Sequence, residues 1–159
     1  MKIDIIAVGK VKESFYREAV AEFEKRLSKY CKLRIVEVAD EKTPEGASPA
    51  QEEQIKAREG ERILKNLRED AYVITLEIQG QKLDSLSFAQ RLDHLGVQGK
   101  SHLQFVIGGS LGLDQRVSQR ADFKLSFSDM TFPHQLMRVI LLEQIYRAYR
   151  IINGEPYHK

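Results

Sequence analysis

The chain alternates short apolar runs with longer segments of helical periodicity from one end to the other. The apolar runs, each of strand length, cover residues 2–8, 33–38, 71–78, 102–107 and 123–127. The helical segments cover residues 13–30, 49–67, 85–95, 114–121 and 133–152. Because strands separated by helices pair in parallel through crossover connections, this order predicts an α/β fold, a mostly parallel sheet with helices on both faces.

Local signals refine this pattern. Ser48 and Gln51 frame a helix-start signature, in which a hydroxyl caps the helix, a proline takes its first position and a glutamine follows three residues after the cap. Residues 79–82 are predicted to form a turn after the third strand. On the first helix, apolar residues from Phe15 to Tyr30 recur at spacings of four and three, which predicts that they face the core.

Length and composition limit the class of protein. The 159 residues, 42% of them hydrophobic, fit a single globular domain spanning residues 1–159. No apolar run approaches the roughly 18 residues that cross a bilayer, and the charged N-terminus is unlike a secretory signal, so we expect a cytoplasmic protein without a membrane segment. The single cysteine, Cys31, can form no internal disulfide, and we expect it to pack as a small apolar side chain.

Charge does not by itself identify a partner, because 25 basic and 23 acidic residues leave a net charge of only +2. Residues 1–34 and 130–159 are basic on balance, whereas residues 35–70 are acidic. If the two basic ends met in the fold, they could form a modest positive surface for phosphate. A mixed, solvated surface explains the same distribution equally well.

The last helical segment is apolar nearly all round between Leu136 and Leu142. Two apolar stripes can be drawn along it, one through Leu141 and Ile145 and one through Leu136 and Val139. One sheet cannot cover both stripes, and a chain of this size has few deep interior positions. We therefore expect a homodimer with this helix at a two-fold interface.

Ligands of open parallel sheets bind at the carboxyl ends of the strands, and three loops at these ends carry distinctive residues. The loops span residues 76–80, 108–112 and 127–133. The second has the sequence Gly-Gly-Ser-Leu-Gly, which lets the backbone approach a flat or anionic ligand closely, although a tight turn without a ligand explains it as well. Its spacing matches neither the dinucleotide-binding nor the triphosphate-binding glycine pattern.

Other familiar chemistries find little support. His94, His102, His134 and His158 are scattered without ligand spacing, so no metal site is predicted. Ser110 does not lie in the elbow sequence of a nucleophilic serine. An NAD-binding enzyme is disfavoured because the glycine fingerprint and a clear acidic partner for ribose are missing.

Four separated motifs resemble a known family. They are IGGSLG at residues 107–112, SFSDMT followed by FPHQLMR at residues 126–138, EQIYRAYR at residues 143–150, and the terminal Pro-Tyr-His at residues 156–158. In this order they closely resemble the small bacterial methyltransferases that methylate pseudouridine in large-subunit ribosomal RNA, members of the trefoil-knotted SPOUT superfamily. The resemblance covers the whole chain.

The resemblance implies a deep trefoil knot in the C-terminal part of the α/β fold and a binding site for S-adenosylmethionine within the knot. The cofactor-binding residues that it implies are Leu76, Gly108, Phe127, Ser128, Asp129, Met130, Thr131 and Phe132. They lie in the three loops that the strand pattern had already singled out. For the apolar members of this set, core packing is the interpretation that the residues alone would favour.

The resemblance also implies catalytic roles for Arg147, Tyr157 and His158. Arg138 and His134 are further candidates for such a role. A cation could stabilise the anion of the attacking base, a histidine could accept its proton, and a tyrosine could stack on it or hydrogen-bond to it. Simpler explanations exist, because Arg147 can pair with a glutamate four residues earlier and chain ends usually fray.

The function implied is S-adenosylmethionine-dependent methylation of position 3 of pseudouridine in 23S ribosomal RNA, by a homodimer whose sites draw on both subunits. The low net charge favours the assembled ribosome over naked RNA as substrate. Two alternatives stay open: a knotted RNA methyltransferase with a different target nucleotide, and a ribosome-binding module without catalysis.

Overall fold

The computed structural model describes all 159 residues, and strands and helices alternate strictly along the chain. The strands are β1 (Lys2–Val8), β2 (Lys32–Val38), β3 (Tyr72–Lys82), β4 (His102–Ile107) and β5 (Phe123–Ser126). The helices are α1 (Ser14–Leu27), α2 (Pro49–Leu64), α3 (Ser85–Val97), α4 (Gln115–Arg120) and α5 (His134–Ile152). None of these helices combines the length and the apolarity needed to cross a membrane.

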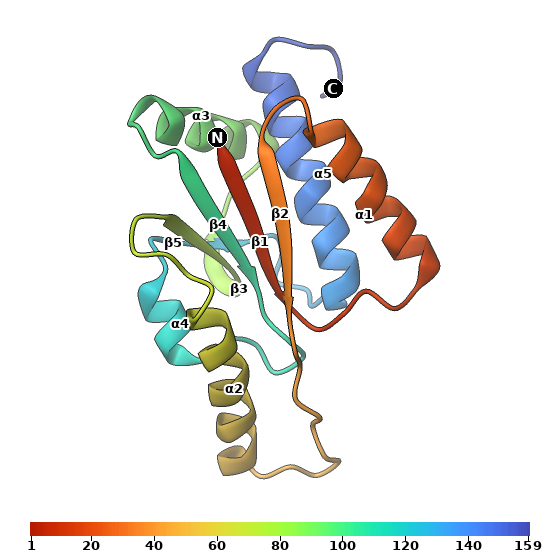
Figure 1. The fold of residues 1–159 in the computed structure, drawn as a ribbon, viewed down its shortest axis with the longest axis vertical. Coiled ribbons are helices and arrows are strands. Elements are labelled where there is room, and N and C mark those ends of the chain that lie inside the picture. The colour runs from red at the N-terminus through yellow and green to blue at the C-terminus, as the bar shows by residue number, and fades with distance from the viewer.

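The strands form one five-stranded sheet in the order β2-β1-β4-β3-β5, and every neighbouring pair is parallel (Figure 1). In β1, Ile5 lies opposite Ile35 of β2 and Phe105 of β4. Nearly every residue of β1 and β4 is buried, as expected for parallel strands that are covered on both faces. The predicted parallel sheet is therefore confirmed.

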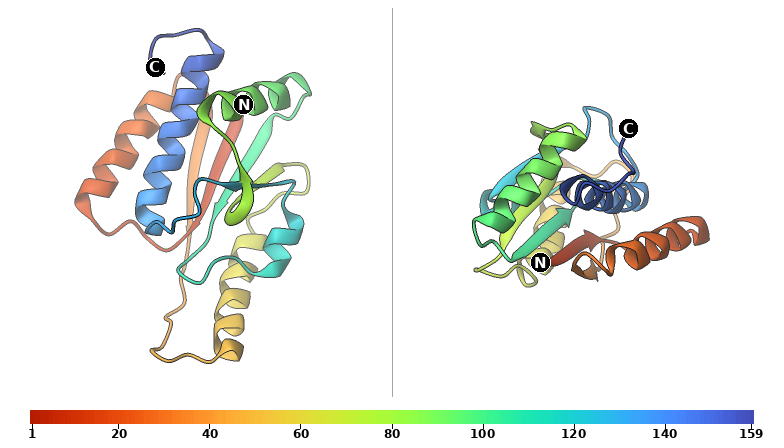
Figure 2. Two further views of the ribbon diagram at one scale, coloured as in Figure 1. Left: turned by 180° about the vertical axis from the view of Figure 1, so that it is seen from behind. Right: turned by 90° about the horizontal axis from the view of Figure 1, so that it is seen from above.

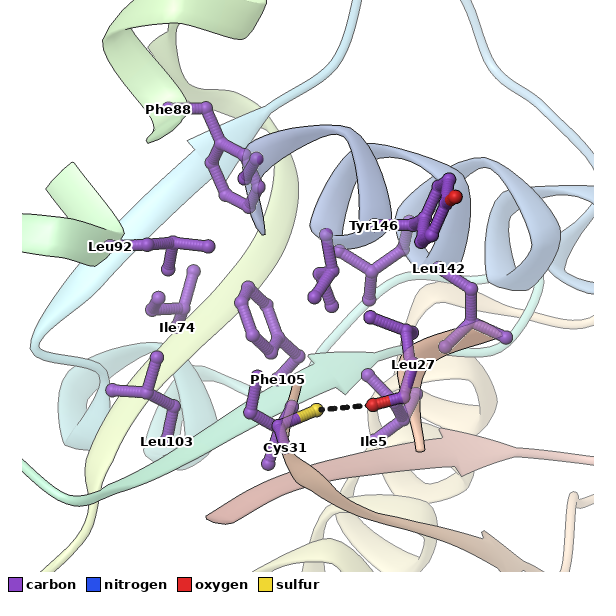
Figure 3. Packing of buried hydrophobic residues seen from close by; sticks show 14 of the residues in the cluster. Ile5, Leu27, Cys31, Ile74, Phe88, Leu92, Leu103, Phe105, Leu142 and Tyr146 are labelled. Atoms are coloured by element: carbon purple, nitrogen blue, oxygen red, sulfur yellow. Dashed lines mark hydrogen bonds between the residues drawn. The ribbon is translucent and has the colours of Figure 1, made fainter. Parts of the chain in front are cut away.

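Helices cover both faces of this sheet, as predicted (Figure 2). Leu27 of α1, Leu92 of α3 and Leu142 of α5 belong to the larger hydrophobic cluster. Ile63 of α2 and Val117 of α4 belong to a smaller cluster on the other face. Figure 3 shows the ring of Phe105 in the larger cluster, between side chains of α3 and those of α1 and α5.

Cys31 packs in this larger cluster, as predicted. The residue is 8% exposed, and its Sγ lies 3.8 Å from the carbonyl oxygen of Leu27 (Figure 3). Burial raises the pKa of the thiol to about 11, so the thiol stays protonated and unreactive at neutral pH.

The prediction that Phe15 faces the core is wrong, because its side chain is 60% exposed. Residues spaced by four drift around a helix by about 40° per step, so a row that starts at Phe15 has left its face by Leu27. The buried face of α1 runs through Val20 and Leu27, which lie seven residues apart and so share one side.

The helix start at Ser48 is confirmed. The Gln51 amide donates to the Ser48 hydroxyl at 3.2 Å, and the Gln51 side-chain oxygen accepts from the Ser48 amide at 2.8 Å. The predicted turn at residues 79–82 is wrong, because β3 continues to Lys82 through an irregularity in its pairing with β5. Helices α1 and α2 each end three residues earlier than their periodicity predicts, at Leu27 and Leu64.

Contacts within one chain cover part of the apolar surface of helix α5. Leu141 and Ile145 of the first stripe are fully buried, and Leu142 in the second stripe is buried as well. This double coverage arises because α5 packs on the sheet while α1 and α3 flank it. Leu136 and Val139 stay half-exposed, so an uncovered apolar strip is left along the first half of the helix.

The two basic ends of the chain meet, because α1 and α5 lie side by side (Figure 1). The Tyr30 hydroxyl, just after α1, donates to the Glu155 carboxylate at 2.7 Å. Much of the positive charge there is paired within the chain: Arg26 with Glu22 at 2.7 Å and Arg150 with Glu155 at 2.8 Å. The meeting of the ends therefore yields a mixed surface more than a positive one.

Candidate functional site

The three loops singled out in the sequence converge at one edge of the sheet. Residues 108–112 follow β4 and residues 127–133 follow β5, whereas residues 76–80 lie inside β3, at the irregularity in its pairing with β5. These three strands are neighbours in the sheet and parallel, so the three segments lie together. Between the loops lies a cavity of about 720 Å³ lined by 20 residues. This volume is within the usual range of roughly 300–1,000 Å³ for small-molecule and cofactor sites.

The irregularity in β3 builds one wall of this cavity. Leu125 of β5 pairs with Leu76 and again with Gln81, so residues 77–80 bulge out of the sheet between two stretches of regular pairing. Gly80 permits this return, because a Cβ at this position would lie 2.7 Å from the carbonyl oxygen of Lys124. Glu77, Ile78 and Gln79 of the bulge line the cavity, next to Leu76.

The glycine loop after β4 forms a second wall. The Gly112 amide donates to the Gly109 carbonyl at 3.1 Å, and Gly112 has a φ of 88°, a left-handed conformation that side chains disfavour. A Cβ at Gly108 would lie 2.9 Å from Cδ2 of Leu113 and 3.2 Å from the backbone carbon of Gly112. The glycines thus make a tight turn, and they also leave backbone exposed to the cavity.

The loop after β5 completes the enclosure. The Met130 amide donates to the Ser128 hydroxyl at 3.0 Å, while the Ser126 hydroxyl donates to the Ser128 carbonyl at 3.2 Å. Phe127, Ser128 and residues 130–134 line the cavity. The side chain of Met130 is 73% exposed at its rim.

Of the eight cofactor-binding residues expected from the sequence, seven line the cavity. They are Leu76, Gly108, Phe127, Ser128, Met130, Thr131 and Phe132. Asp129 does not line it, because its side chain is 80% exposed and pairs with Lys82 at 2.6 Å. This ion pair joins the loop after β5 to the end of β3 and so holds two walls of the cavity together.

His134 also lines the cavity, at the start of α5. Burial, and next the charge of Arg138, lower the pKa of its imidazole, so the ring is neutral at physiological pH. Its buried Nδ1 has no hydrogen-bond partner. His134 and Arg138, the further catalytic candidates from the sequence, both lie in the first turns of α5, towards the opposite end of the helix from Arg147.

Arg138 ties the start of α5 to the sheet. It is 1% exposed, pairs with Glu37 of β2 at 2.5 Å and donates to the carbonyl of Gly9 at 3.1 Å. Gly9 also accommodates His134, since a Cβ there would lie 3.1 Å from Cε1 of the imidazole. These contacts make Arg138 a structural anchor for His134 and the cavity wall.

The three residues expected to be catalytic form a separate cluster around Glu143. Tyr157 donates its hydroxyl to the Glu143 carboxylate at 2.7 Å, and Arg147 pairs with the same oxygen at 2.6 Å. Arg147 also lies 3.2 Å from Nδ1 of His158 and 4.7 Å from the centre of the Tyr157 ring. The chain end is thus held in place. Glu143, considered from the sequence only as an ion-pair partner of Arg147, is the centre of the cluster.

The electrostatics of this cluster keep two of its groups in defined states. The hydrogen bond to Glu143 raises the pKa of Arg147, which stays a cation. Burial, together with the hydrogen bond to Glu143, raises the pKa of Tyr157, which stays a neutral donor at physiological pH. The pair provides a cation and a hydroxyl next to each other on the surface.

The cavity and this cluster lie apart within one chain. His134 and Arg147 are separated by 13 residues of α5, which corresponds to about 20 Å along the helix axis. No group of three or more histidine, cysteine, aspartate or glutamate side chains is arranged to hold a metal ion. The structure therefore shows a ligand-sized cavity and a distant polar cluster on the two halves of one helix.

Comparisons with known proteins agree on a family. A family described as "Predicted SPOUT methyltransferase" matches residues 1–158. The protein of Bifidobacterium adolescentis named "Ribosomal RNA large subunit methyltransferase H" is 65% identical over 159 residues, and its counterpart of the same name in Clostridium tetani is 58% identical, each covering 100% of both chains.

Two solved structures share the fold at 15% sequence identity. A tRNA (m1G37) methyltransferase from Aquifex aeolicus superposes with a TM-score of 0.57, covering 100% of this chain and 75% of that one. A probable methylase family protein from Haemophilus influenzae Rd KW20 superposes with a TM-score of 0.55, covering 99% and 70%. At this identity the likeness concerns the arrangement of the elements.

Proposed function

The chain belongs to the SPOUT methyltransferase family, and we propose that it methylates position 3 of pseudouridine in 23S ribosomal RNA with S-adenosylmethionine as methyl donor. One observation carries this proposal: three loops far apart in the sequence line a single cavity of cofactor size. Relatives that match the full chain are named as methyltransferases of large-subunit ribosomal RNA.

The residues around the cavity fit such a nucleoside cofactor. Leu76, Met130 and Phe132 offer apolar surface for an adenine ring, and backbone groups of the loops can hydrogen-bond to its edge. Gly108 lets the backbone approach closely. When bound, S-adenosylmethionine supplies an electrophilic methyl group. The protein supplies alignment and a dry pocket.

The polar cluster on α5 fits the other requirement, which is to stabilise the anion of the base whose ring nitrogen attacks the methyl group. The ring nitrogen of pseudouridine must lose its proton, and a fixed cation stabilises the resulting charge. In our proposal Arg147 provides this cation, His158 accepts the proton and Tyr157 hydrogen-bonds to the base.

Because the cavity and the Arg147 cluster lie apart within one chain, we infer that a second copy of the chain brings them together. The half-exposed strip with Leu136 and Val139 lies on α5 between the two groups. A homodimer that packs α5 against α5 in opposite directions would place the cluster of one subunit near the cavity of the other. A single molecular mass equal to the monomer at micromolar concentration would contradict this arrangement.

The trefoil knot stays a prediction from the family resemblance, and the cytoplasmic location stays a prediction from the sequence pattern. Residues 77–80 leave the sheet and return to it around β5. We propose that the segment after β5 threads this part of the chain. Mechanical stretching from both ends would test the knot, because a knotted chain extends less than the roughly 3.5 Å per residue of a free one.

The decisive experiment incubates the protein with radiolabelled S-adenosylmethionine and ribosomes that lack the modification, and then maps the methylated nucleotide. We expect methylation of a pseudouridine in 23S RNA, and we expect whole ribosomes to be better substrates than isolated RNA. Methylation of another nucleotide would indicate a different target. Cofactor binding without transfer to any ribosomal preparation would indicate a ribosome-binding module.

A further inference from the structure

One acidic side chain in the cavity has no role in the function proposed above. Of the 20 residues that line the cavity, Glu77 is the only aspartate, glutamate, lysine or arginine. The other walls consist of apolar side chains, glycines and a few neutral polar groups. Glu77 is half-exposed, and a bound ligand would remove water from its carboxylate, which costs free energy unless the ligand itself donates hydrogen bonds to it.

Two hydroxyl groups hold the Glu77 carboxylate in one orientation. The Thr75 hydroxyl donates to Oε2 at 2.6 Å, and the Ser118 hydroxyl donates to Oε1 at 2.7 Å. Thr75 lies in β3 and is completely buried, and Ser118 lies in α4, so both donors come from regular elements. The carboxylate is therefore fixed before any ligand enters.

This arrangement leaves each carboxylate oxygen with unused acceptor capacity. An ionised carboxylate accepts at about four positions, and Thr75 and Ser118 provide one donor to each oxygen. Two acceptor oxygens on one carbon match two hydroxyl groups on neighbouring carbons, as in the 2′,3′-diol of a ribose. Acidic side chains bind ribose hydroxyls in the same way in dinucleotide-binding folds.

We propose that Glu77 is the ribose-binding residue of the cavity and accepts hydrogen bonds from both hydroxyls of the cofactor nucleoside. The inference rests on the proposed function, because it requires an adenosine cofactor in this cavity. Thr75 and Ser118 are positioning residues in this scheme, since they hold the carboxylate but do not reach the ligand themselves. Because Glu77 is next to Leu76, the diol would lie beside the apolar wall assigned to the adenine ring.

The test measures binding of S-adenosylhomocysteine and of its 2′-deoxy and 3′-deoxy analogues by calorimetry, without any methyl transfer. For the wild-type protein we expect each deoxy analogue to bind roughly ten- to hundredfold more weakly. In Glu77→Gln the parent ligand should lose affinity and the discrimination between ribose and deoxyribose should shrink. Glu69→Gln, an exposed glutamate, serves as the matched control and should behave as wild type.

Ser118→Ala separates orientation from charge. This variant keeps the carboxylate but frees Oε1 from its donor, so we expect weaker discrimination with a smaller loss of parent affinity than in Glu77→Gln. A purely structural role of Glu77 would lower the affinity for all three ligands by the same factor, and this result would overturn the proposal.

Other outcomes are equally informative. If Glu77→Gln weakened binding of cationic S-adenosylmethionine but left S-adenosylhomocysteine unchanged, the carboxylate would act on the sulfonium charge and the ribose assignment would be wrong. If the wild-type protein bound none of these nucleosides, the proposed function itself would fail. If it bound them without preferring ribose, only the assignment of Glu77 would fail.

Discussion

Among individual residues, Gly108 gives the most direct test of the cofactor cavity. In Gly108→Val the new side chain meets Leu113, whose Cδ2 would lie 2.9 Å from the Cβ. Leu113 lines the cavity and ends in a flexible side chain, so the valine and the displaced leucine together fill space meant for a ligand. We expect the affinity for S-adenosylhomocysteine to fall by roughly a hundredfold or more.

The control for this variant is its own folded state. Circular dichroism should stay that of the wild type, because the Leu113 side chain can move away from the new Cβ. The melting temperature should fall only modestly, since the backbone carbon of Gly112 at 3.2 Å must give by a few tenths of an ångström. Undiminished affinity in a folded Gly108→Val protein would refute the location of the site.

Some residues of the site could be predicted from the sequence and others could not. The family resemblance assigned Leu76 and Gly108 to the cofactor, and the strand pattern separately singled out the segments that contain them, because neighbouring parallel strands end at one edge of a sheet. The ion pair of Asp129 could not be predicted, because its partner Lys82 lies 47 residues away, beyond any local pattern. The role of Glu77 was missed for a similar reason, since its donor Ser118 comes from another element.

At the scale of the elements, Asp4 joins three strands near their amino ends. Its side chain lies in β1 and is 4% exposed. Burial alone would raise its pKa, but hydrogen bonds from Arg34, Gln104 and His102 together lower the pKa below its usual value of 3.8. These residues lie on β2 and β4, on either side of β1. The Asp4 carboxylate therefore links β1 to both of its neighbours in the sheet, β2 and β4.

Asp4→Asn should lower the free energy of unfolding by roughly 1–3 kcal/mol near neutral pH. Because the folded-state pKa is depressed, the stabilisation is complete above pH 3.8 and is lost as the pH falls through the lower folded value. Urea unfolding at neutral pH and at about pH 2.5 checks this prediction, with exposed Asp93→Asn as control. An equal difference between wild type and Asp4→Asn at both pH values would contradict it.

The irregular pairing of β3 and β5 makes Gly80 a second sensitive position. In Gly80→Ala the Cβ would lie 2.7 Å from the Lys124 oxygen and 2.8 Å from its carbonyl carbon, and this backbone belongs to the paired strand β5. We expect a loss of about 1–3 kcal/mol in unfolding free energy, measured by denaturant titration.

Gly96→Ala in α3 is the matched control, because its Cβ would meet only the end of Met1 at 3.7 Å. This substitution should stabilise the protein by about 0.5–1 kcal/mol, since alanine favours the helix. A neutral Gly80→Ala would mean that β5 can move away from the bulge.

The elements were predictable where the pattern is local. The strand at residues 2–8 and the capping box at Ser48 follow from neighbouring residues, and the structure has both. The return of β3 to the sheet at Gln81 and Lys82 was not predictable, because it depends on pairing with β5, more than 40 residues later in the chain. The exposure of Phe15 was missed because a spacing of four drifts around the helix.

The assembled protein raises a question that no single chain answers, because the cavity and the Arg147 cluster occupy different halves of α5. The apolar surface of this helix suggested a dimer from the sequence, yet α1, α3 and the sheet already bury much of it. A second copy is required chiefly by the proposed reaction, since each site needs both a cavity and an Arg147 cluster.

Mixing two inactive variants tests this arrangement. Gly108→Val spoils the cavity but keeps the cluster, whereas Arg147→Ala keeps the cavity but loses the cation. In a heterodimer with sites shared between subunits, one site combines the intact cavity of one chain with the intact cluster of the other, and the second site carries both defects. After unfolding and refolding an equal mixture, half of the dimers are mixed, so about one quarter of the wild-type activity should return. Each variant refolded alone provides the baseline. If the cavity and the cluster of the same chain formed each site, the mixture would stay as inactive as its parts.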